Sequence, residues 1–216
     1  MKKIFFRNRL SIIGFSLVLI LGAGKAAQAS GITEGHRATI DQVITVVTDP
    51  QYKDDRTTRR SKMKDIIFPK FNFLEMGKRS LGNKHWKKIK PEERKAFVDV
   101  FGKLLENSYA NKLENYSDEK INYVDEIVKG KYAMVKTEVV RKNDSINVDY
   151  KLIESPNEWL VYDIVVEGVS LIKNYRSQFG KVIHNDSFDV LMDKLNAKVK
   201  KLEAGNDVEE EDKDKI

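Results

Sequence analysis

The chain has 216 residues, no cysteine, three histidines, and 39 lysines and arginines against 33 acidic side chains. Without cysteine, and with histidines that are far apart in sequence, it lacks the residues for a disulfide, a cysteine nucleophile or a histidine-rich metal site. Five of its basic residues and none of its acids fall within residues 1–29, so the rest is nearly neutral, which argues against a nucleic-acid partner.

The first 29 residues have the pattern of an export signal. Basic residues precede an apolar run over residues 12–23, and Ala27-Gln28-Ala29 provides the small residues of a signal-peptidase site. The run is shorter than the ~20 residues that a membrane span requires. We therefore expect export and cleavage after Ala29, leaving residues 30–204 as one domain.

Four amphipathic helices are predicted first. Apolar residues recur every three to four positions in four segments, which cover residues 36–48, 57–68, 71–81 and 91–115. The last of these begins with Pro91 followed by two glutamates, a typical helix start. Its apolar stripe places Phe97, Phe101 and Leu105 on one face.

The chain then changes to the pattern of β-strands. Turn sequences such as Lys129-Gly130 separate four segments typical of strands, over residues 119–128, 131–141, 145–154 and 158–166. From Leu160 to Val166 the last strand is apolar except for Asp163, so we expect both of its faces to be covered. Ser170 and Ser187 can cap two final helices. Helices, an antiparallel meander and helices again predict an α+β domain.

Residues 205–216 carry six acidic side chains against two lysines. This composition is typical of a disordered, solvated tail, and a docking element for a partner is the less favoured interpretation.

Asp163 is the strongest candidate for a catalytic group. A carboxylate in an apolar strand can have a raised pKa suited to proton transfer. A small secreted isomerase or hydrolase that uses Asp163 is therefore one hypothesis. The favoured interpretation is that Asp163 bonds a backbone group or a basic side chain. Outside residues 1–29 no glycine motif for phosphate or dinucleotide is present, so we expect no nucleotide cofactor.

Two basic groups remain, Arg56 to Lys64 and Lys78 to Lys90. They are either solvated helix faces or surfaces for an anionic membrane or an acidic partner protein. A protein that acts only as an adaptor through these surfaces is a further hypothesis, and it predicts a filled core without ligand.

Several short motifs together resemble one known family. They are Phe73-Leu74-Glu75-Met76, Pro91-Glu92-Glu93-Arg94, Leu105-Glu106-Asn107-Ser108-Tyr109, Val161-Tyr162-Asp163, Glu167-Gly168-Val169-Ser170-Leu171 and Asn174-Tyr175-Arg176-Ser177-Gln178-Phe179. In this combination the chain resembles the MlaC family of periplasmic phospholipid-binding shuttles, called toluene-tolerance proteins in some bacteria.

The resemblance implies a non-enzymatic carrier without cofactor, located in the periplasm. It implies a fold like that of nuclear transport factor 2, with a four-stranded antiparallel sheet packed against helices and an apolar lipid cavity between them. The implied partners are phospholipid, an inner-membrane ABC transporter complex and an outer-membrane lipoprotein complex.

A carrier needs an apolar lining, because sequestering acyl chains from water gains about 0.8 kcal/mol per buried CH₂. The sheet and the helices expected to face it supply the predicted lining. These residues are Phe97, Phe101, Leu105, Val135, Val139, Val148, Tyr150, Val161, Val165, Tyr175 and Phe179. A carrier for a hopanoid or another apolar lipid is an alternative of the same class.

Overall fold

The computed structural model describes residues 31–114 and 119–204, so the predicted export signal and acidic tail lie outside the described residues. The helices are α1 (Gly31–Thr48), α2 (Arg56–Ile67), α3 (Phe73–Trp86), α4 (Pro91–Glu114), α5 (Leu171–Asn185) and α6 (Phe188–Glu203), with short 3₁₀ turns η1 (Pro50–Tyr52) and η2 (Phe68–Lys70). The strands are β1 (Lys120–Lys129), β2 (Tyr132–Val140), β3 (Ser145–Ser155), β4 (Glu158–Val166) and β5 (Val169–Ser170).

The strands form one antiparallel sheet in the order β1-β2-β3-β4-β5. The predicted α+β class is confirmed, but the described sheet has a fifth strand. After β4, Glu167 and Gly168 adopt positive φ angles of 48° and 77°, which reverse the chain within two residues. Val169 and Ser170 then pair with Val166 and Val165. A two-residue strand is too short to produce a periodic pattern, so the sequence did not predict it.

Side-chain caps define where several helices begin. The Asn72 side chain accepts a hydrogen bond from the Glu75 amide at the start of α3. Ser170 and Ser187 accept from amides three residues ahead, as the sequence predicts for α5 and α6. The first helix begins at Gly31, earlier than the predicted residue 36, because the buried Ile32 anchors an added turn to the sheet.

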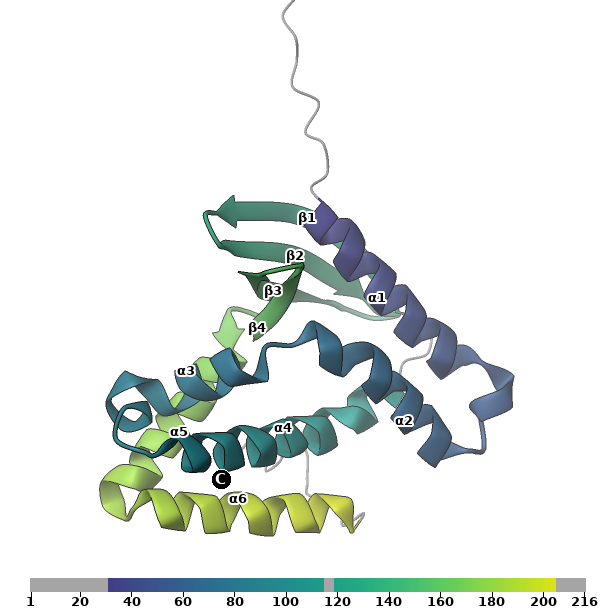
Figure 1. The fold of residues 1–216 in the computed structure, drawn as a ribbon. Helices are drawn as coiled ribbons and strands as arrows, with labels where there is room; N and C mark the ends of the chain where they lie inside the picture. Colours follow the sequence, from purple (N-terminus) through teal and green to yellow (C-terminus); the bar gives the residue numbers. More distant parts are fainter. Residues whose placement is uncertain (1–30, 115–118, 205–216) are drawn as a thin grey trace, which may run out of the picture.

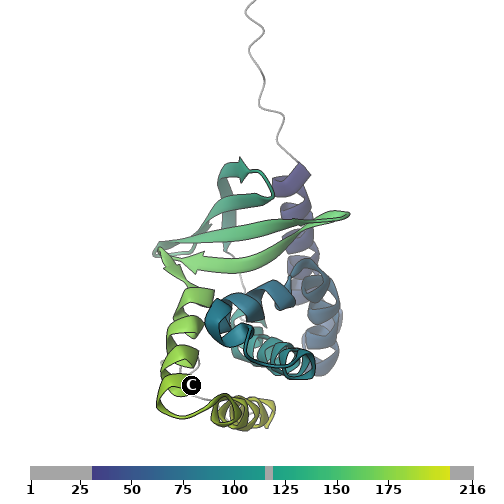
Figure 2. The same cartoon turned by 60° about the vertical axis from the view of Figure 1, so that its left-hand side comes forward.

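The apolar residues form two separate clusters. One fills the space among α3, α4, α5 and α6, and the other lies where Ile32 of α1 meets the sheet. Figure 1 shows this division: the sheet lies above, the layer of α3 to α6 below, and α1 runs from the sheet down to α2. In Figure 2, α5 descends from the end of the sheet into the helical layer. None of the described helices is long and apolar enough to cross a membrane.

Candidate functional site

One face of the sheet carries a nearly continuous apolar surface, here called the α1 face. The strand register places its residues on the same side, because directly paired residues in an antiparallel sheet point the same way. Val135 of β2 lies opposite Tyr150 of β3, and Tyr150 lies opposite Ile164 of β4. The α1 face comprises Tyr123, Ala133, Val135, Val139, Ile146, Val148, Tyr150, Leu152, Val161 and Ile164.

Helix α1 is fastened to this face at its N-terminal end. The Thr33 amide and hydroxyl both donate to Oε2 of Glu126, at 2.9 and 2.5 Å. The His36 ring lies on the Tyr150 ring with centroids 4.0 Å apart, and it meets the edge of the Tyr123 ring at 5.9 Å. We call these five residues the α1 latch. Next to it, the Arg37 guanidinium lies 4.0 Å above the Tyr123 ring.

Burial keeps the rings of the latch uncharged at neutral pH. It lowers the pKa of His36 from 6.5 to about 4. It raises the pKa of Tyr150 to about 12, and it also raises the pKa of Tyr123. The aromatic rings of the latch therefore form an uncharged cluster, beside the Glu126 carboxyl group and the Arg37 guanidinium.

The α1 face is only partly covered. Tyr150 and Ile164 remain half-buried, and Val166 at the end of β4 is 42 % exposed. Beyond the latch, α1 runs away from the sheet and packs against α2, with Val43 buried (Figure 1). On the other side, η2 leads to Phe71, which bridges to Val161. Half of the α1 face is thus buried, at Ala133, Val135, Val148, Leu152 and Val161, and its other five residues remain partly exposed.

The structure separates the predicted lining residues into two groups and one isolated residue. On the α1 face lie Val135, Val139, Val148, Tyr150 and Val161. Within the helical core lie Phe97, Phe101, Leu105, Tyr175 and Phe179. In that core Phe101 packs edge-on against Tyr175 at 5.1 Å, and both are fully buried.

Val165 lies on the opposite face of β4. In the pairing of β3 with β4, Leu152 lies opposite Val161 and the preceding residue, Lys151, lies opposite Asp163. Tyr162 is therefore an extra, unpaired residue in β4, which is a β-bulge. Without the bulge, Val161 and Val165 would point the same way. With it, Val161 faces α1, while Asp163 and Val165 face α5.

Sequence reasoning missed several residues of the site. Ile32 and His36 were outside or at the edge of the predicted first helix. Tyr123, Leu152 and Ile164 lie on strands whose pairing was not known from the sequence. The correct strand register places all three on the α1 face, because each pairs directly with a residue on that face of the sheet.

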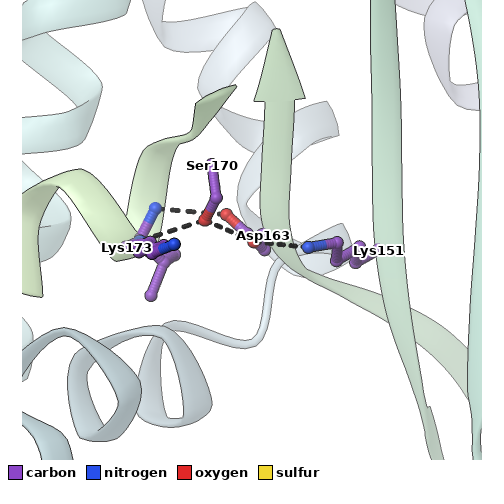
Figure 3. Close-up of polar contacts among 5 residues, drawn as sticks. Lys151, Asp163, Ser170 and Lys173 are labelled. Atoms are coloured by element: carbon purple, nitrogen blue, oxygen red, sulfur yellow. Dashed lines mark hydrogen bonds and ion pairs between the residues drawn. The ribbon is translucent and has the colours of Figure 1, made fainter. Parts of the chain in front are cut away.

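Asp163 holds the start of α5 (Figure 3). Its Oδ2 accepts hydrogen bonds from the Ser170 hydroxyl at 2.7 Å and from Lys151 Nζ at 3.3 Å. Its Oδ1 accepts from the Ile172 amide at 3.1 Å. This agrees with the favoured sequence interpretation, a bond to a backbone group and a basic side chain. Within the described residues, no three His, Asp or Glu side chains are grouped so that they could hold a metal ion.

Residues 37–197 match the family described as MlaC protein. The intermembrane phospholipid transport system binding protein MlaC of Haemophilus influenzae is 26 % identical over 149 residues, 66 % of this chain and 69 % of the relative. The toluene tolerance protein ttg2D of Pseudomonas putida is 27 % identical over 143 residues, 65 % of this chain and 66 % of the relative. The matched segments thus span about two thirds of these relatives.

A solved structure has the same fold. It is the phospholipid-binding protein from Ralstonia solanacearum in complex with a phospholipid. The superposition has a TM-score of 0.71 at 25 % sequence identity and covers 79 % of this chain and 97 % of that chain.

Proposed function

Because the chain belongs to the MlaC family, whose members are periplasmic lipid carriers and not enzymes, we propose that it carries a phospholipid with the acyl chains against the α1 face. The observation that supports this location is the partly covered apolar surface of the sheet beneath α1. The helical core is a poorer candidate, since its aromatic rings are fully buried against one another.

Lipid binding on the α1 face requires α1 to move. Two hollows of about 420 and 260 Å³ lie away from the sheet, lined by residues of α3, α4 and α6. We propose that the lipid separates α1 from the sheet by opening the α1 latch. The five latch residues and Ile32 make the described contacts that hold this end of α1 to the sheet.

The magnitudes allow this opening. At about 0.8 kcal/mol per buried CH₂, a chain of about 15 such groups gains on the order of 12 kcal/mol on leaving water. The latch consists of three hydrogen bonds, including a long one of 3.5 Å between Tyr123 and His36, worth roughly 1 to 3 kcal/mol each, and two ring contacts, worth roughly 1 kcal/mol each. Burial of a whole acyl chain therefore outweighs the latch contacts that are lost.

Transport between membranes completes the proposal. Export with cleavage after Ala29 places the carrier in the periplasm, and the relative from Haemophilus influenzae is named as part of an intermembrane phospholipid transport system. We propose that this chain exchanges its lipid with an inner-membrane ABC transporter complex and an outer-membrane lipoprotein complex. No covalent chemistry is needed, because the cargo is moved and not changed.

Native mass spectrometry tests the function. The protein is purified from a periplasmic extract without detergent, and the bound lipid is released by solvent extraction and identified. We expect one phospholipid per chain. A protein that is empty and also fails to take up added phospholipid would contradict the proposal.

A further inference from the structure

The corner between α3 and α4 contains a groove that the lipid site does not use. It has a volume of about 420 Å³, and it is lined by Leu74, Trp86, Pro91, Arg94, Lys95, Val98 and Asp99. Leu74, at the edge of the groove, is 60 % exposed and adds an accessible apolar side chain to it. We call this feature the corner groove.

The corner groove lies in a strongly basic surface. Residues 74–99 carry eight lysines and arginines against four acidic side chains. The pKa of His85, next to Trp86 in the chain, is lowered first by burial and then by repulsion from Lys84 and Lys88. The surface thus favours a negatively charged occupant.

Much of this charge has no partner. Lys95 pairs with Asp99 at 2.6 Å, and Arg94 donates to the Trp86 carbonyl at 3.0 Å. In contrast, four lysine side chains make no ion pair within the described residues, 31–114 and 119–204. They are Lys84, Lys87, Lys88 and Lys90. The other basic group differs, since Lys64 of α2 pairs with Glu106 at 2.9 Å and Lys62 lies over the Tyr52 ring.

The acidic segment 205–216 follows α6, which ends within reach of this groove. Glu203, the last residue of α6, lines a second hollow together with Lys103 and Asp99 of α4. Asp99 also lines the corner groove, so the two hollows are neighbours. Twelve residues reach up to about 40 Å when extended, which exceeds the roughly 18 Å of α4 between Lys103, in the hollow of Glu203, and Pro91, in the corner groove.

We propose that the acidic segment 205–216 docks on the corner groove of its own chain. Its six carboxylates complement the four unpaired lysines, and Val208 within it can occupy the apolar hollow beside Leu74. Single exposed ion pairs contribute little to binding. The covalent link of the segment to α6 compensates for this weak binding, because a short tether gives the segment an effective concentration at the groove on the order of millimolar. The docked state is therefore sensitive to salt.

Paramagnetic labelling tests the docking directly. Because the chain has no cysteine, Asn206→Cys provides a unique site for a nitroxide in residues 30–216 and leaves Val208 in place. We expect a selective loss of amide peak intensity over residues 84–95. The intensity returns at about 1 M salt, where the Debye length falls to about 3 Å. A nitroxide on Lys129→Cys, at the turn between β1 and β2, is the reference and leaves these peaks unchanged.

Charge variants assign the docking site. Replacing Lys84, Lys87, Lys88 and Lys90 with glutamine restores the lost intensity, whereas Lys62→Gln together with Lys64→Gln on α2 does not. The proposal is overturned if the label causes no selective loss, or if the loss centres on residues 56–64. It is also overturned if the loss persists undiminished when labelled protein is mixed with separate isotope-labelled protein, because the contact is then between chains.

Discussion

The α1 latch makes the stability of the protein depend on pH through His36. Its pKa is about 4 in the folded protein and 6.5 in the unfolded chain. Between these values the unfolded chain binds more protons, so the free energy of unfolding falls as the pH is lowered from 6.5 to 4. A pKa difference of about 2.5, at about 1.4 kcal/mol per unit, corresponds to a maximum loss of about 3.5 kcal/mol in the free energy of unfolding. At pH 5 about 2 kcal/mol of this is lost.

Urea unfolding at pH 8 and pH 5 measures this effect, with His36→Phe as the comparison. Phenylalanine keeps a ring against Tyr150 and removes the titrating group. Other ionisable groups titrate equally in both proteins, so the difference between their two pH effects isolates His36. We expect the original protein to lose about 2 kcal/mol more than the variant. Equal losses would show that His36 is not buried at the sheet, and the account of the latch would be refuted.

Three further predictions use substitutions in the sheet and helices. Val148→Phe on the α1 face should lower the amount of co-purified phospholipid, measured by native mass spectrometry, whereas Val165→Phe, at an equally buried position on the opposite face, should not. Equal lipid content in the two variants would contradict the assignment of the lipid to the α1 face. Asp163→Asn should lower the free energy of unfolding in urea by about 1 to 3 kcal/mol, because it weakens the bonds to Lys151 and to the start of α5. The folded variant should still hold lipid, and loss of lipid without loss of stability would argue for a direct role of Asp163 in lipid binding. Gly82→Ala should destabilise the folded protein by about 1 to 3 kcal/mol, because φ at Gly82 is +73°. Gly35→Ala, in open space within α1, should stabilise it by up to about 1 kcal/mol. Similar shifts in the melting temperature of the two variants would count against the backbone conformations described at these glycines.

The order of elements was predictable from the sequence because each signal is local. Helical spacing, proline and serine start signals and turn dipeptides depend on neighbouring residues, and they located α2 to α6 and β1 to β4 to within a few residues. The start of α1 was missed because Gly31 and Gly35 are weak helix formers. Its helical state depends on the contact of Ile32 with the sheet.

The division of the apolar residues between site and core was not predictable in the same way. The stripe of Phe97 and Phe101 would look the same whether it faced a cavity or α5, because periodicity reports which side is buried and not what covers it. Strand faces depend on register, and the bulge at Tyr162 moved Val165 to the other face. A bulge inserts one residue without altering the composition of the strand, so alternation alone cannot locate it.

Photo-crosslinking tests the central claim most directly. A benzophenone amino acid is placed at Ile164 on the α1 face or at Ile153 on the opposite face of the sheet, both half-buried, and the protein is irradiated with bound radiolabelled phospholipid. We expect covalent lipid adducts from position 164 and few from position 153. Equal labelling at both positions, or labelling at 153 alone, would contradict a lipid site between α1 and the sheet.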